Sequence, residues 1–307
     1  MKQLKHGLTF LSCVFVGVLL LTSKPMAAEY FLISEVGSSA EMIGMGNIEG
    51  YGSAANSIFD NPAALKRVNR GSVSVFTTTF MNELTYTSIA VATTTPIGKI
   101  GFGYMEAAVS NIPFTEISTG NSQFYSNLNF DYKNQITKIS YENTIAKNLS
   151  VGASLVQYST SFYTFSGKAT NMDLGATYDL NPIELSLFAR NIFSGQQIQI
   201  DDGVETLPTQ VVGGVKYTYN DVAVMGQCSL KQGKNLFAAG VNYTPSFLPY
   251  IQLTAGYKQF LALNNIKSNV TLGLGFKLDM LQLNYAYEKS EHLLYDNKNY
   301  FSMSLNF

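Results

Sequence analysis

The residues that most often carry out catalysis are nearly absent from this chain. The sequence has two histidines, and only His292 lies beyond the first 28 residues. It falls in a predicted connection at residues 289–298, away from any nucleophile pattern, where a histidine is usually solvated. No GxSxG, HExxH or phosphate-loop motif occurs. We therefore predict that the protein is not an enzyme.

Patterns that bind metals are missing as well. Asp201 and Asp202 precede Gly203, but the spacing lacks the further oxygen ligands of a calcium loop, so it predicts a polar turn. Cys13 lies in an apolar N-terminal run, which leaves Cys228 as the one cysteine after that run. A lone cysteine forms neither an internal disulfide nor a cysteine metal cluster, and it suits a small apolar position in a strand. We predict no metal and no cofactor.

The composition indicates β-structure. Only 13% of the 307 residues are charged, and 46% are hydrophobic, whereas soluble domains are about 25% charged. The 20 basic and 21 acidic residues nearly cancel, so the basic surface of a nucleic-acid binder is missing. Abundant Tyr, Phe and Gly favour strands with tight bends.

The first 28 residues have the layout of a secretory signal peptide. Lys2 and Lys5 precede an apolar run from Leu8 to Leu21, and small residues follow near Ala28. The run is shorter than the roughly 20 residues of a membrane-spanning helix. We predict export, with cleavage near Ala28.

Beyond residue 71, apolar and polar residues alternate with the period of a strand. In residues 269–279, five apolar side chains fall on one face and small or polar ones on the other. About fourteen such segments follow, starting near residues 72, 84, 98, 134, 148, 168, 183, 207, 221, 235, 250, 268, 281 and 299. An even number of segments, many of 9 to 12 residues, is typical of an outer-membrane barrel.

The predicted connections are sorted by length. The long ones, at residues 106–133, 194–206 and 289–298, all fall at one rim, and short links such as YND at 219–221 fall at the other. Barrels in the outer membrane have this asymmetry, and strands that face lipid must pair all the way round. The chain ends on Phe307, an aromatic residue on the predicted lipid face. The predicted fold is all-β: an antiparallel transmembrane barrel of about 14 strands at residues 72–307, in the outer membrane of a Gram-negative-type bacterium.

The residues before the first strand carry a distinctive motif. The sequence EMIGMGNIEGYGSAANSIFDNPAALKRV, residues 41–68, resembles the N-terminal segment of the PorV/PorQ proteins, relatives of the FadL outer-membrane transporters. The resemblance rests on Gly44, Met45 and Gly46, followed by Asn61, Pro62 and Ala63, and it extends to FARNIFSG (188–195), ETLPTQVVGGVKY (205–217) and the final hairpin. Two departures are that residues 53–56 lack an acidic pair and that Ala64 replaces a glycine.

The resemblance implies that residues 29–71, which we call the hatch segment, fold into the barrel lumen. Asn61 and Pro62 can begin a capped helical turn, and Gly44 and Gly46 permit close approach to the wall. For Asn61 and Pro62 a capping role is favoured over contact with a ligand. The segment is also too short to form a stable hydrophobic core of its own.

Two roles remain open. The resemblance to PorV implies binding of secreted proteins or of secretion-system components in type IX protein secretion, with Ile112, Phe114, Phe124 and Tyr125 as a contact surface in the connection at 106–133. The relation to FadL implies a channel for a hydrophobic ligand. We predict inward faces made of polar residues and glycine, which favours binding over transport. Family resemblance alone does not assign either function.

Overall fold

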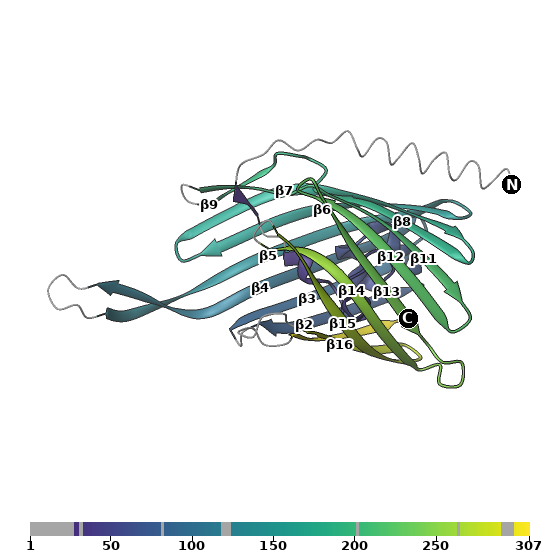
Figure 1. The fold of residues 1–307 in the computed structure, drawn as a ribbon. Helices are drawn as coiled ribbons and strands as arrows, with labels where there is room; N and C mark the ends of the chain where they lie inside the picture. The colour runs from purple at the N-terminus through teal and green to yellow at the C-terminus, as the bar shows by residue number, and fades with distance from the viewer. Residues whose placement is uncertain are drawn as a thin grey trace.

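The computed structural model describes residues 28–30, 33–80, 83–117, 124–200, 203–262, 265–289 and 298–307. Within these residues, fourteen antiparallel strands close into a barrel in the order β11-β12-β13-β14-β15-β16-β17-β2-β3-β4-β5-β6-β7-β8 (Figure 1). The strands are β2 (Gly71–Phe80), β3 (Leu84–Thr95), β4 (Gly98–Ile117), β5 (Phe124–Ala146), β6 (Leu149–Phe162), β7 (Phe165–Leu180), β8 (Ile183–Arg190), β11 (Gln210–Tyr219), β12 (Val222–Lys231), β13 (Lys234–Tyr243), β14 (Ile251–Ala262), β15 (Asn265–Leu278), β16 (Leu281–Glu288) and β17 (Lys298–Asn306). The predicted barrel and its strand number are confirmed.

The barrel closes where the last strand meets the first. β17 pairs with β2 over seven residue pairs, from Tyr300 opposite Thr78 to Asn306 opposite Ser72. The terminal Phe307 extends this ladder through backbone hydrogen bonds with Arg70 and Gly71, and its side chain is exposed on the outer wall. Among the strands that the structure describes, none in the barrel is therefore left with an unpaired edge along the membrane.

Alternating exposure separates the outer wall from the lumen. On β15, Val270, Leu272 and Leu274 are 56%, 55% and 51% exposed, whereas Thr271 between them is 0% exposed. Large exposed apolar side chains of this kind would be costly in water, and lipid covers them in a membrane barrel. The protein is therefore a multi-pass β-barrel of the outer membrane.

We predicted a loop at residues 106–133, and this prediction is wrong. β4 continues to Ile117 and β5 begins at Phe124, so the two strands form a long hairpin with shifts of register between Val109 and Ile112 and between Phe114 and Thr115. Strands of 20 and 23 residues exceed the roughly 9 to 11 that cross a bilayer. Figure 1 shows this hairpin extending well beyond the other strands.

The connection between β8 and β11 also contains strands. β9 (Gln197–Ile200) pairs antiparallel with β10 (Gly203–Thr206), and β10 pairs in parallel with the short β1 (Ala28–Glu29). The sequence did not predict this three-stranded sheet, because the alternation of polar residues in the connection was too weak a pattern to indicate strands. Both it and the long hairpin lie at the rim where long connections were predicted, and the opposite rim has short turns, as expected.

The segment of residues 33–67 lies inside the barrel (Figure 1). It forms the 3-10 helix η1 (Ile33–Val36), the α-helix α2 (Ala40–Gly44) and the 3-10 helices η2 (Ala55–Phe59) and η3 (Pro62–Arg67). α2 contacts β14 to β17, and η3 contacts β4 to β7. Within the described residues, no helix is long and apolar enough to cross a membrane.

Candidate functional site

The Asn61-Pro62-Ala63 motif forms the capped turn that its sequence predicts. The Asn61 side chain accepts a hydrogen bond from the Ala63 amide at 2.9 Å, and Pro62 occupies the first position of η3. The Asn61 amide nitrogen then donates to the Ser186 hydroxyl of β8 at 2.9 Å. One side chain thus caps the start of η3 and attaches it to the lumen wall.

Glycines in the wall make room for this turn. A Cβ atom at Gly175 would lie 1.9 Å from the side-chain oxygen Oδ1 of Asn61, and one at Gly152 would lie 2.5 Å from the Ala63 backbone nitrogen. Contacts between non-bonded carbon atoms are normally about 3.5–4.0 Å. A larger residue at either wall position would therefore displace η3.

The glycines of the Gly-Met-Gly motif meet the wall on the other side of the lumen. Gly46 has a φ of +82°, which favours glycine, and its amide donates to the Thr271 hydroxyl at 3.0 Å. The same hydroxyl donates to the Gly44 carbonyl at 3.2 Å. A Cβ atom at Gly256 would lie 2.0 Å from the Gly46 nitrogen.

Two further wall glycines extend this contact. A Cβ atom at Gly240 would lie 2.3 Å from the Met45 carbonyl oxygen, and one at Gly273 would lie 3.1 Å from the Gly44 Cα. Sequence reasoning identified glycines in the hatch segment and missed their partners in the strands. Their signal was available, because a glycine at an inward position of a strand often marks a close backbone approach.

One ion pair and two hydrogen bonds from charged side chains join the hatch segment to the wall near η2. Arg190 of β8 donates to the Glu49 carboxylate and, at 3.1 Å, to the Phe59 carbonyl. Lys138 of β5 donates to the same carbonyl at 3.2 Å and pairs with Asp173 of β7 at 2.6 Å. All four charged side chains are nearly inaccessible to solvent. Two wall cations therefore converge on one backbone oxygen of the segment.

A second set of ion pairs lies close to the short-turn rim. Lys66 pairs with Asp179 at 2.6 Å and with Glu184 at 3.1 Å, and Arg67 pairs with Glu184 as well. Asp179 is half exposed, so solvent weakens its contribution. These pairs fix the direction in which η3 leads into β2.

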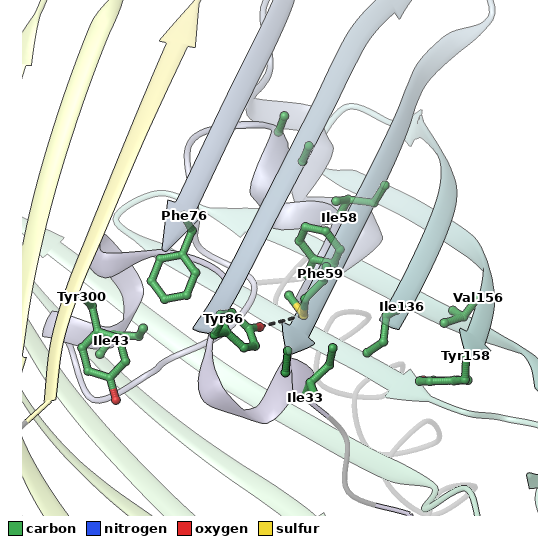
Figure 2. Packing of buried hydrophobic residues seen from close by; sticks show 14 of the residues in the cluster. Ile33, Ile43, Ile58, Phe59, Phe76, Tyr86, Ile136, Val156, Tyr158 and Tyr300 are labelled. Atoms are coloured by element: carbon green, nitrogen blue, oxygen red, sulfur yellow. Dashed lines mark hydrogen bonds between the residues drawn. The ribbon is translucent and has the colours of Figure 1, made fainter. Parts of the chain in front are cut away.

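Apolar side chains of the lumen wall pack against apolar residues of the hatch segment. Phe76, Tyr86 and Tyr300 form contacting rings, with centroids 5.5 Å apart for Phe76 and Tyr86 and 6.1 Å for Phe76 and Tyr300. Figure 2 shows them with Ile33 of η1 and with further inward-facing residues of β5 and β6. The cluster also includes Met105, Ala107, Ile136, Val156, Tyr158 and Ala169. The prediction of a uniformly polar lumen is wrong for this part of the wall, because aromatic and aliphatic residues occupy inward positions of strands whose other inward residues are polar.

The residues predicted as a partner-contact surface lie on the projecting hairpin. Ile112 and Phe114 belong to β4, and Phe124 and Tyr125 to β5, where Ile117 pairs with Phe124. Phe114 stacks on Tyr163 with centroids 5.2 Å apart. Tyr163 contacts Phe130, which packs against Phe162.

The remaining predicted features either lie away from this site or fall outside the described residues. Residues 1–27 of the predicted signal peptide lie outside them, as do Asp201, Asp202 and His292. Cys228 is partly buried, on the outward-facing positions of β12. In the described residues no group of three or more His, Cys, Asp or Glu could hold a metal ion.

This geometry defines a class: an outer-membrane β-barrel whose lumen is filled by its own N-terminal segment. The fold is similar to those of solved hydrocarbon channels. The Ralstonia pickettii toluene transporter TbuX matches with a TM-score of 0.60 and 11% identity, covering 88% of this chain and 98% of the other. The P. putida toluene transporter TodX matches with a TM-score of 0.60 and 15% identity, covering 88% and 99%.

A Pseudomonas aeruginosa FadL homologue is similar as well, with a TM-score of 0.54, 11% identity, and coverage of 87% of this chain and 97% of the other. No protein-family model and no curated protein sequence matches the chain. At these identities the similarity establishes the fold, which is that of FadL-type barrels.

Proposed function

We propose that this protein is an outer-membrane channel for small apolar molecules, closed by the hatch segment at residues 29–71 after export removes residues 1–28. The observation that carries the proposal is the apolar cluster in the lumen around Phe76, Tyr86 and Tyr300. These rings pack against apolar residues of the hatch segment, so movement of the segment would open an apolar surface inside the barrel. The similarity in fold to toluene transporters supports the same class of ligand.

The hatch segment must move for a ligand to pass. A cavity of about 80 Å³ lies beside it, bordered by Arg190, Gln227, Lys231 and Lys258. A cavity that binds benzene in another protein measures about 150 Å³, so this space is too small and too polar for a hydrocarbon. Passage therefore needs displacement of part of the segment, which would uncover the wall side of the apolar cluster, where Phe76, Tyr86 and Tyr300 are now buried.

The test is uptake of toluene by cells that lack other transporters for it. Expression of the wild-type chain should raise uptake above that of cells with an empty vector. Ile136→Asn places an amide in the apolar cluster and should reduce the gain, whereas Thr137→Asn, on the neighbouring outward position of β5, should not. Uptake no higher than in the empty-vector cells would refute the channel.

The second role, binding of secreted proteins in the manner of PorV/PorQ proteins, is favoured by a different observation. The β4/β5 hairpin projects from the rim and carries Ile112, Phe114, Phe124 and Tyr125. Phe114 is 36% exposed and Leu128 is 62% exposed, and exposed apolar residues often mark interaction surfaces.

Shortening this hairpin separates the two roles. Replacing residues 112–130 by a two-residue turn should leave toluene uptake intact if the protein is a channel. If the protein binds secreted cargo, the intact protein should co-purify with secreted proteins that share a C-terminal domain, and the shortened form should not.

A further inference from the structure

Five charged groups meet where η2 ends, and their charges do not balance. The cations are Lys138 and Arg190 of the wall, and the carboxylates are Asp173 of the wall with Glu49 and Asp60 of the hatch segment. Three carboxylates against two cations leave one negative charge without a partner. All five side chains are buried, where an uncompensated charge is costly.

The hydrogen bonds indicate which carboxyl lacks a cation. Lys138 pairs with Asp173 at 2.6 Å, and Arg190 pairs with Glu49. Asp60, only 2% exposed, accepts one neutral hydrogen bond from the Ser38 hydroxyl at 2.8 Å. Its second oxygen, Oδ2, has no hydrogen-bond partner among the described residues.

We propose that Asp60 is a proton-binding site of the closed barrel, and that loss of this proton weakens the docking of the hatch segment. The groups that face Asp60 are Glu49 from the segment, Arg190 from β8, Lys138 from β5 and the Tyr86 hydroxyl from β3. Arg190 and Lys138 are already engaged by other carboxylates and by the Phe59 carbonyl. A proton on Asp60 therefore neutralises the charge that these cations leave uncompensated.

The environment of Asp60 supports this assignment. Burial raises the pKa of the Asp60 carboxyl from its ordinary 3.8 to about 7, and the Glu49 carboxylate adds to the increase. The docked state thus binds the proton more tightly than the released state does. Docking is strongest below pH 4, weakens as the pH rises towards 7, and changes little above that, because the carboxyl is then ionised in both states. Between pH 5 and pH 8 the equilibrium constant for release should rise roughly a hundredfold.

The inference rests on the hatch part of the proposed function and is independent of what the barrel transports. The experiment accordingly measures release of the segment rather than uptake of a hydrocarbon. Failure of the pH dependence would leave toluene uptake unaffected, and failure of toluene uptake would leave the pH dependence measurable.

Amide hydrogen exchange of the folded barrel in detergent tests the site. Exchange of residues 55–68, corrected for the intrinsic effect of pH, reports the release equilibrium when reclosing is fast. Wild type should lose protection between pH 5 and pH 8, and Asp60→Asn, which mimics the protonated acid, should lose far less. Glu41→Gln is the matched control: Glu41 is another carboxyl of the segment whose pKa burial raises, and this variant keeps Asp60.

The outcomes are distinct. A much shallower profile in Asp60→Asn than in wild type, with a steep one in Glu41→Gln, supports the proposal, and equal slopes in wild type and Asp60→Asn overturn it. If Asp60→Asn does not fold, infrared spectroscopy of the Glu41→Gln protein replaces it. A protonated carboxylic acid band that is present at pH 5 and disappears on titration through pH 7 supports the site, and absence of that band overturns it.

Discussion

A single methyl group at Gly256 should expel part of the hatch segment. A Cβ atom there would lie 2.0 Å from the Gly46 nitrogen and 2.2 Å from the Met45 carbonyl carbon. Both are backbone atoms, so no flexible side chain can move aside. Gly256 itself is held in β14 between β13 and β15, and the wall therefore yields less readily than the segment.

The free energy of docking that would be lost can be estimated from the interactions made by the Gly44–Gly46 region. Release of the Gly44–Gly46 region loses two hydrogen bonds with Thr271, each contributing about 1 kcal/mol. It also exposes Met42 and Met45, both 1% exposed when docked, at about 2 kcal/mol each. The loss is about 6 kcal/mol. It destabilises the docked state of the segment, whereas the hydrogen bonds between barrel strands remain intact.

Hydrogen exchange on Gly256→Ala provides the assay. Residues 40–48 should lose protection. The barrel itself should stay folded, so an unheated sample should still migrate on gels as a folded barrel does. Gly226→Ala is the control, because the nearest atom to its new methyl group is 3.9 Å away, on Val215. Unchanged protection of residues 40–48 in Gly256→Ala would refute the argument that close backbone contact holds the segment.

Three further predictions follow from the facing of residues and from the cap. Leu274→Arg should reduce the yield of folded barrel, since arginine on the lipid face costs roughly 2–4 kcal/mol, whereas Lys277→Arg, on an inward position, should be tolerated; equal yields would contradict the facing. In a cysteine-free background, a cysteine at Thr164 should react with an impermeant reagent on intact cells, and one at Ser246 only after the outer membrane is broken; the reverse result would invert the topology. Asn61→Ala should destabilise η3 by about 1 kcal/mol and raise exchange at residues 62–67 more than at 40–48, and a uniform change would show that the cap is not local.

The barrel could be predicted because a membrane imposes strict rules on sequence. Alternation at inward and outward positions located most strand starts to within a few residues, for example at 84, 98 and 281. The rule fails where strands leave the membrane. β4 and β5 continue past the bilayer, where both faces can be polar, and bulges at Val109/Ile112 shift the alternation, so the sequence there has the features of a loop.

The site could be predicted only in part, because half of it lies on other strands. The cap at Asn61 depends on neighbouring residues and is visible in the sequence. The partners Ser186, Gly175 and Gly256 are set by the register of β8, β7 and β14, which no local pattern specifies. Arg190 was part of a recognised motif, but its pairing with Glu49 requires that the hatch segment already be placed.

The two sides of the hatch segment are held by different chemistry. At α2 the wall strands β13 to β15 meet it through glycines, and backbone atoms touch backbone atoms. At η2 and η3 the wall strands β5, β7 and β8 add charged side chains to contacts of this kind. Close backbone packing is insensitive to pH and salt, whereas charged contacts respond to both. Conditions that change the charge of the cluster around Asp60 therefore act first on the η2–η3 side of the segment.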